Sequence, residues 1–513
     1  MSEERAKKAL ISAISAGYQL DRDALSFLEV LPETCETADV VKKAVEKASG
    51  LPQKPMFISR DLLEEAAEEI LPVKETERSG IVEGVTGKEI FHPYAKEISA
   101  EMKIIADPTS MNSTGSIDDF LQCFRDRFNK IERLLRQRMD VRGAVSIQEA
   151  LNARPNTEVK TIGLVYDRRE RKRTIMLQIE DLENSATVMI PPSASQTVFE
   201  KAQKILLDQV ICVCVTRSRG DLLIASDIIL PDIPERKPIH AKENVCIALT
   251  SDLHIGSRVF LKDVLNRFIL WLNGKLGSTR DRELAGLVKY VVIAGDLVDG
   301  IGVYPEQEKE LEISDIYEQY RIAAQYIEQI PDYIEVVIIP GNHDATRQAL
   351  PQPAIPKKYA EPIYSVREVT MLGDPATVQL HGVNLLLYHG RSLEDVIGSV
   401  PHLTYDQPEK AMELLLKARH VAPVYGKRTP IAPESHDQLI IEDCPDIFHV
   451  GHIHINGYES YRGTLLVNSG AWQKTTEYQR KMGLTPTPGR VPIVNLATMQ
   501  LTEMDFMGYE LST

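Results

Sequence analysis

Residues 335–344 read EVVIIPGNHD, an apolar run that ends in a Gly-Asn-His-Asp motif. The run has the length and the β-branched residues of a strand that is buried on both faces. Asn342 and His343 follow it directly, where a loop held by a rigid sheet lets side chains converge on a ligand. Amide oxygens and imidazole nitrogens both bind divalent metal ions. The segment therefore predicts a buried strand with a ligand site at its carboxyl end.

Four more apolar runs repeat this arrangement. Strands are predicted at 245–250, 290–294, 384–388 and 446–450. They are followed by the motifs Asp252-x-His254, Gly295-Asp296-x-x-Asp299, Tyr388-His389-Gly390 and Gly451-His452-x-His454. One such motif alone is a common loop sequence. Five of them in order, each at the end of a predicted strand, indicate a hydrolase with two metal ions.

The motif set resembles the calcineurin-like metallophosphoesterases, a superfamily that includes phosphoprotein phosphatases and the nuclease of double-strand-break repair. Its members share a double β-sandwich flanked by helices. Three longer segments are similar to the small subunits of archaeal D-family DNA polymerases: 340–355 (PGNHDATRQALPQPAI), 388–397 (YHGRSLEDVI) and 482–496 (MGLTPTPGRVPIVNL). This resemblance runs from about Ser116 to the C-terminus.

The resemblance implies a metal ligand set. A first ion would be held by Asp252, His254 and His454. A second ion would be held by Asn342, His389 and His452. The carboxylate of Asp296 would bridge the two ions. Ligands of this type accept Mn, Fe, Zn, Ni or Mg, and we favour two Mn²⁺ ions because related nucleases use them.

The resemblance also implies catalytic roles beside the metals. His343 would stabilise the transition state or protonate the leaving 3′ oxygen, and Asp344 would orient its ring. Asp299 is interpreted as a structural group behind the ligands. The implied reaction is metal-dependent 3′–5′ exonuclease proofreading at single-stranded or mismatched DNA 3′ ends. The implied partner is the large catalytic subunit of the polymerase, in a heterodimer or a larger assembly.

Two other functions remain open at this point. One is a non-catalytic scaffold subunit, as in related eukaryotic polymerases that have lost metal ligands. The filled ligand positions of this chain argue against it. The other is a phosphoprotein phosphatase of the same superfamily, which the region upstream of the motifs disfavours.

That upstream region predicts an oligonucleotide-binding (OB) barrel. Five strands are expected at 160–167, 174–181, 186–190, 209–216 and 222–229, with a helical stretch at 193–208 between the third and the fourth. This order is that of the OB-fold, whose loops often bind oligonucleotides. A basic cluster lies between the first two strands and is a candidate DNA contact: Arg168, Arg169, Arg171, Lys172 and Arg173. The alternative is a solvated hairpin tip on a barrel that only docks a protein.

Length and charge set further limits. The 513 residues suggest an α+β protein of several domains. These are a helical module at 1–70, a flexible linker at 71–115, a helix packing on the barrel at 116–156, the OB-fold at 157–236 and the phosphoesterase domain at 240–513. The helix at 116–156 has a Ser116 and Asp119 capping box and an apolar stripe that includes Phe120 and Phe128.

The net charge of −15 is unusual for a protein that holds DNA alone, because neutralising phosphates supplies much of the affinity. We therefore expect a partner subunit and the metals to help bind DNA. The six cysteines have no zinc spacing and indicate a reducing compartment. No secretory signal or membrane span is recognisable, so we expect a cytoplasmic protein without a membrane partner.

Overall fold

The computed structural model describes residues 91–108, 111–218 and 222–509. In the N-terminal part it describes residues 16, 18–20, 24, 28, 37–49, 57–58, 62–63 and 66. The chain divides into two compact units, Met1–Lys88 and Glu89–Thr513.

In the first unit, the structure describes helix α3 and a small sheet with their bounds. Helix α3 (Thr37–Ser49) buries Val40, Val41 and Ala44 on one face. Strand β1 (Gln19–Leu20) pairs in parallel with β2 (Phe57–Ile58). Helix α3 lies within the helical module predicted at 1–70, most of which falls outside the described residues.

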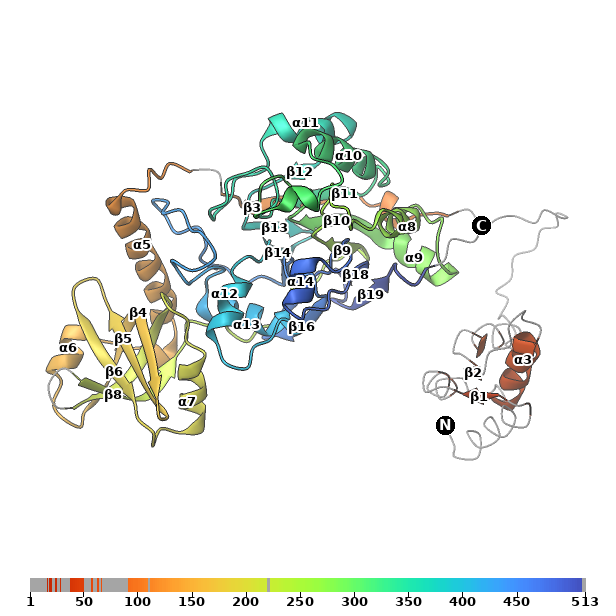
Figure 1. Ribbon diagram of the computed structural model, residues 1–513. Helices are drawn as coiled ribbons and strands as arrows, with labels where there is room; N and C mark the ends of the chain where they lie inside the picture. The colour runs from red at the N-terminus through yellow and green to blue at the C-terminus, as the bar shows by residue number, and fades with distance from the viewer. Residues whose placement is uncertain are drawn as a thin grey trace. The chain divides into compact units, whose positions relative to one another are not determined.

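The second unit is built around two six-stranded sheets (Figure 1). The first sheet has the order β12 (Thr370–Met371), β11 (Glu335–Ile339), β10 (Val288–Ala294), β9 (Cys246–Thr250), β18 (Arg490–Asn495) and β19 (Leu501–Asp505). The second has the order β16 (Gly457–Tyr461), β17 (Thr464–Asn468), β15 (Ile447–Val450), β14 (Val383–Tyr388), β13 (Ala376–Leu380) and β3 (Met102–Ala106). All five strands predicted to precede a motif are present.

The two sheets share one apolar core and are covered by helices. Leu249 and Val292 of the first sheet join Leu385 and Val467 of the second in a single buried cluster. A second cluster joins the first sheet to α8 (Lys262–Leu272), α9 (Thr279–Leu287), α10 (Ile316–Glu328) and α11 (Lys357–Val366). A third joins the second sheet to α12 (Leu393–Ser399) and α13 (Pro408–Ala418). The helices therefore flank a pair of packed sheets, and the predicted α+β class is confirmed.

The predicted barrel is also present. It closes in the order β4 (Glu158–Arg171), β5 (Thr174–Glu180), β6 (Ser185–Ile190), β8 (Leu222–Ile229) and β7 (Val210–Arg217). Helix α7 (Gln196–Gln203) lies between β6 and β7, where a helical stretch was predicted, and α6 (Ile147–Asn152) precedes β4. Because alternate side chains of the strands fill the interior, the barrel has its own core.

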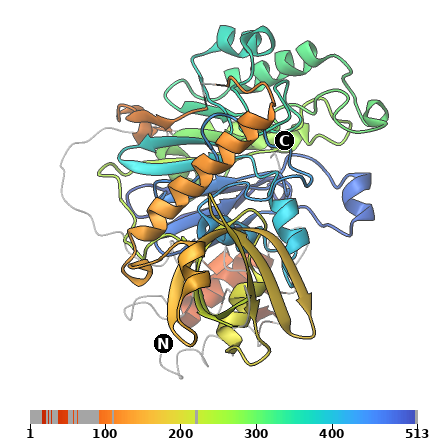
Figure 2. The same cartoon turned by 90° about the vertical axis from the view of Figure 1, so that its left-hand side faces the viewer.

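Helix α5 (Ile117–Arg136) extends from the barrel toward the sheets (Figure 2). Its predicted capping box is present, since Ser116 Oγ accepts from the Asp119 amide at 3.2 Å and Asp119 accepts from the Ser116 amide at 3.0 Å. Phe128 of its apolar stripe packs on the barrel as predicted. Phe120 instead meets the ring of Tyr425 beyond the barrel, with ring centroids 5.3 Å apart.

A buried ion pair fastens α5 to the segment that follows α13. Arg127 Nε lies 2.7 Å from Asp437 Oδ2, and both side chains are 1% exposed. The same oxygen lies 3.0 Å from Nε2 of His420, and Arg127 Nη1 donates to the Pro423 carbonyl at 2.7 Å. We refer to Arg127, Asp437 and His420 as the junction cluster.

The flexible linker predicted at 71–115 is wrong in its second half. Residues 102–106 form β3, which pairs antiparallel with β13 at the edge of the second sheet. The strand was missed because four of its five residues are exposed, so that no alternation of apolar and polar residues marks it.

Candidate metal centre

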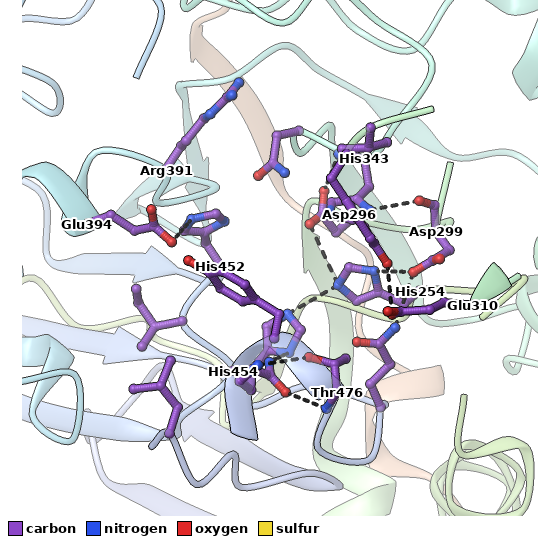
Figure 3. Close-up of a pocket in the computed structure, with 18 of the residues that line it drawn as sticks. His254, Asp296, Asp299, Glu310, His343, Arg391, Glu394, His452, His454 and Thr476 are labelled. Atoms are coloured by element: carbon purple, nitrogen blue, oxygen red, sulfur yellow. Dashed lines mark hydrogen bonds and ion pairs between the residues drawn. The ribbon is translucent and has the colours of Figure 1, made fainter. Parts of the chain in front are cut away.

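All seven predicted ligands meet at one end of the two sheets. The loops after β9, β10 and β11 bring Asp252, His254, Asp296 and Asn342, and the loops after β14 and β15 bring His389, His452 and His454. Most of these side chains line a cavity of about 540 Å³ (Figure 3). The strand ends therefore converge as the sequence predicts.

The backbone at these loops is strained. Left-handed φ angles occur at five of the seven positions, namely Asp252 (54°), His254 (50°), Asp296 (51°), His452 (71°) and His454 (62°). Non-glycine residues rarely adopt this conformation, and it persists where the surrounding structure enforces it. Gly295 is required beside them, because a Cβ there would lie 2.5 Å from His389 Nδ1. Such clustering of strain is typical of functional sites.

The first group of ligand atoms lies around Asp252. Its Oδ1 is 3.3 Å from His454 Nε2, and His454 Nε2 is 3.1 Å from His254 Nε2. Asp252 Oδ1 is buried and has no hydrogen-bond partner. A buried carboxylate oxygen is rarely left unpaired. The orphaned oxygen and the two imidazole nitrogens that face it fit a divalent cation.

The second group lies around Asp296. Its Oδ2 is 3.4 Å from His389 Nε2 and 3.7 Å from His254 Nε2, so one carboxylate faces both groups. Asn342 Oδ1 is 3.0 Å from His389 Nε2. The His452 ring lies 5.1 Å from that of His389. This arrangement is compatible with the bridging role predicted for Asp296.

Hydrogen bonds behind the ligands set the histidine tautomers. His254 Nδ1 lies 2.9 Å from Asp299 Oδ1, and His389 Nδ1 lies 2.9 Å from the Ala294 carbonyl. Because both Nδ1 atoms donate to these oxygens, Nε2 is the nitrogen of each ring that would bind a metal. Asp299 therefore supports a ligand, as the sequence interpretation placed it.

The two central carboxylates are ionised. Burial opposes ionisation of Asp296, but the adjacent His389 and His343 hold its pKa well below the usual range. Burial likewise opposes ionisation of Asp252, and His454 outweighs it, so that the pKa of Asp252 is about 2. Buried negative charge of this kind requires cations nearby. Histidines alone or metal ions can provide them.

A chain of hydroxyl groups holds the other oxygen of Asp252. Asp252 Oδ2 accepts from the Ser251 hydroxyl and from the His452 amide, the latter at 2.9 Å. Ser251 Oγ lies 2.7 Å from Ser469 Oγ, which lies 3.0 Å from His449 Nε2. This serine relay connects the two sheets beneath the ligands. The motifs do not predict this relay, and its only signal in the sequence is the serine directly before Asp252.

His343 lines the cavity beside the first group. Its Nδ1 lies 2.7 Å from the Asp299 carbonyl oxygen, and its ring centroid is 4.7 Å from that of His254. Because Nδ1 donates to this carbonyl, Nε2 is the ring nitrogen left for a ligand in the cavity. Whether it transfers a proton stays a prediction.

The orienting role predicted for Asp344 is wrong. Its carboxylate makes no hydrogen bond to His343 and accepts from four buried donors, the amides of Leu297, Val298 and Gly341 and the hydroxyl of Tyr320. Burial and the nearby Asp296 raise the pKa of Asp344 to about 6. Asp344 thus holds the loops together, and a backbone carbonyl orients the ring instead.

The basic cluster of the barrel is not the single exposed loop that was predicted. Arg168 lies within β4 and donates to the carbonyls of Ile205 and Ser399, each at 3.2 Å, so it connects the barrel to α12. The hairpin turn is only Lys172 and Arg173, both with positive φ. Arg173 bonds Gln196 at 2.8 Å. The other two arginines remain exposed, and Arg169 pairs with Asp167. Arg168 is therefore removed from the candidate DNA contacts.

The cavity has further polar walls that the motifs did not reveal. They include Tyr304, Glu310, Arg391, Glu394, Tyr405, Arg428 and Tyr478. Arg391 and Glu394 belong to the segment 388–397, which was noted only for its resemblance. No helix among the described residues is both long and apolar enough to cross a membrane.

Comparison with known proteins identifies the family. Residues 247–456 match the family of the DNA polymerase alpha/epsilon B subunits. The DNA polymerase II small subunit of Methanothermobacter thermautotrophicus is 42% identical over 406 residues, which cover 79% of this chain and 83% of the relative. That of Archaeoglobus fulgidus is 39% identical over 491 residues, 95% of each chain. The chain belongs to the DNA polymerase II small subunit family. The resemblance to archaeal polymerase small subunits is thereby confirmed.

Proposed function

We propose that this small subunit is a metal-dependent 3′–5′ exonuclease that proofreads for an archaeal DNA polymerase, together with a large catalytic subunit. The observation that carries the proposal is the convergence of three imidazole Nε2 atoms on two buried carboxylates, one of which has an unpaired oxygen. Membership of a polymerase small-subunit family supports DNA as the substrate.

The residues present fit two divalent ions, which we propose to be Mn²⁺. Asp252, His254 and His454 would hold one, Asn342, His389 and His452 the other, and Asp296 both. When bound, such ions supply Lewis acidity and lower the pKa of water to near neutrality. The chain itself fixes the ligand directions through Asp299, the Ala294 carbonyl and the serine relay.

His343 is the proposed proton donor. Its Nδ1 is held by the Asp299 carbonyl, which fixes the ring and leaves Nε2 as the nitrogen that a substrate would contact. A proton on Nε2 would pass to the 3′ oxygen that leaves when the P–O3′ bond breaks. The nucleotide released would carry the phosphate at its 5′ position.

A non-catalytic scaffold is the second candidate. The match to the family of alpha/epsilon B subunits favours it, because the sequence resemblance includes eukaryotic small subunits that lack metal ligands. The complete ligand set of this chain favours catalysis instead. A protein phosphatase is the third alternative, and the barrel disfavours it.

One assay separates the three functions. The purified chain, alone and with the large subunit, is incubated with Mn²⁺ and either a 5′-labelled single-stranded oligonucleotide or a phosphopeptide. Stepwise shortening from the 3′ end supports the exonuclease. Release of phosphate from the peptide alone would identify a phosphatase. No reaction on either substrate, in a protein that metal analysis finds free of bound ions, would identify a scaffold.

A further inference from the structure

Beyond the candidate ligands, the side chains that line the cavity are more often acidic than basic. Glu310 and Glu394 add carboxylates to a site that already contains Asp296 and Asp299. Only two side chains of its lining are arginines, and one of them, Arg428, pairs with Glu394 at 3.0 Å. A DNA strand that enters this cavity must therefore meet a cation that is free to bind it.

Arg391 is that cation. Within the described part of the chain, no carboxylate lies within ion-pair distance of its guanidinium. The group is half-buried and belongs to the lining of the cavity, among whose residues Figure 3 labels it. Its Nη1 donates to the backbone oxygen of Gln348 at 3.0 Å and to the side-chain oxygen of the same residue at 3.1 Å. No bond from Nε or Nη2 to a described residue is present, so one edge of the guanidinium is available.

The position of Arg391 is tied to the metal ligands on two sides. It lies two residues after His389 in the chain. Gln348, which holds it, also donates to the Asn342 carbonyl at 2.8 Å. Because both His389 and Asn342 belong to the second group of ligands, the guanidinium keeps a fixed place beside that group.

We propose that Arg391 binds a backbone phosphate of the DNA strand next to the scissile phosphodiester, an inference that rests on the proposed function. A guanidinium with a free edge binds phosphate by two parallel hydrogen bonds. Tyr405 and Tyr478 line the same cavity, and the side chain of Tyr478 is 54% exposed, so that a base can stack there. An acidic chain can then hold a 3′ end without a basic surface.

The test measures binding separately from hydrolysis. Full-length Arg391→Gln and wild-type protein are titrated with a single-stranded oligonucleotide whose 3′-terminal linkages are phosphorothioates, at several salt concentrations. Loss of one bidentate contact between a guanidinium and a phosphate should raise the Kd for the oligonucleotide by about 10–100-fold. The slope of log K against log salt should fall by about 0.7, because one phosphate fewer is neutralised. Arg391→Lys should restore the slope but only part of the affinity.

Arg133→Gln is the matched control, since Arg133 is 60% exposed on α5 and lies outside the cavity. It should leave both Kd and slope unchanged. The inference would be overturned if Arg391→Gln kept the wild-type Kd and the wild-type slope of log K against log salt. It would also be overturned if Arg133→Gln changed both quantities as much as Arg391→Gln does.

A kinetic comparison separates this inference from the proposed function. Bis(nitrophenyl) phosphate has no neighbouring phosphate, so kcat/KM for the oligonucleotide should fall further in Arg391→Gln than kcat/KM for this small ester. Equal losses on both substrates would overturn the phosphate contact. If wild-type protein hydrolyses neither substrate, the exonuclease proposal fails, and the binding titration still decides the role of Arg391.

Discussion

The candidate metal centre and the junction cluster are both buried groups of charged and imidazole side chains. They differ in whether the buried polar atoms have hydrogen-bond partners within the chain. At the junction, Arg127, Asp437 and His420 satisfy one another at 2.7 and 3.0 Å, and the Ala422 amide donates to the remaining nitrogen of His420. At the candidate centre, Asp252 Oδ1 and His452 Nε2 are buried without a hydrogen-bond partner, and their nearest charged neighbours, His454 and Glu394, lie 3.3 and 3.7 Å away.

This difference separates a structural cluster from a binding site. Leaving a buried polar atom unpaired costs free energy, and a bound ion that the atom can contact would offset this cost. The junction cluster is complete within the chain, whereas the candidate centre has hydrogen-bonding atoms that the proposed cations would pair. Five substitutions test this distinction.

Asp296→Ala should abolish exonuclease activity, because it removes the carboxylate that faces both ligand groups. Metal analysis should find fewer than two ions per chain. The metal-free variant should still fold but with a lower thermal midpoint, because the His343 amide loses its acceptor, Asp296 Oδ1 at 2.8 Å. Retained activity in a variant depleted of metal would show that the centre has been misassigned.

His343→Ala should retain both ions and slow hydrolysis by about 10²–10⁴-fold, because the ring is proposed to donate a proton and not to bind metal. The measurements are metal content and single-turnover rate. Loss of an ion would make His343 a ligand, and an unchanged rate would remove it from the reaction.

Arg127→Met tests the complete cluster. Removing one partner leaves Asp437 buried without its cation, which should cost about 3–5 kcal/mol of stability. Urea denaturation measures the loss. Arg133→Met on the same helix is the control, because its exposed pair with Glu442 should contribute no more than about 1 kcal/mol. An equal loss of unfolding free energy in the two variants would show that the junction cluster contributes no more than an exposed ion pair. The metal content should stay the same in both variants.

Ser251→Ala should weaken Mn²⁺ binding by about 10–100-fold, as expected for loss of a group that orients a ligand. Calorimetric titration of the metal-free protein measures this directly. Ser365→Ala, whose hydroxyl donates to the Glu361 carbonyl on α11, serves as the control. An unchanged affinity in Ser251→Ala would mean that the serine relay does not position Asp252.

The junction also predicts a pH dependence of stability. Burial, reinforced by Arg127, lowers the pKa of His420 to about 4. Between about pH 6.5 and pH 4 the unfolded chain therefore binds a proton that the folded chain does not, and the free energy of unfolding falls as the pH is lowered, by up to about 1.4 kcal/mol per unit. His420→Gln should flatten this slope in urea titrations. His436→Gln, at an exposed histidine, should not.

Much of the fold and the ligand set could be predicted from sequence, because both depend on local patterns. The run before Asn342 is apolar enough to mark a buried strand, and the motif after it is contiguous. The errors have a different origin. Asp344 follows His343 in sequence, yet the ring bonds the carbonyl of Asp299, and a carbonyl has no sequence signature. Arg168 seemed part of a loop because β4 continues past the predicted strand end.

The edge strand β3 has a consequence for how the chain is made and shortened. It pairs with β13, whose residues are synthesised about 270 positions later, so the second sheet cannot be completed until most of the chain has left the ribosome. A shortened protein that begins at Ser116 would keep every candidate ligand. It would also leave the β13 edge open to pairing with another chain, which makes such a fragment prone to aggregation.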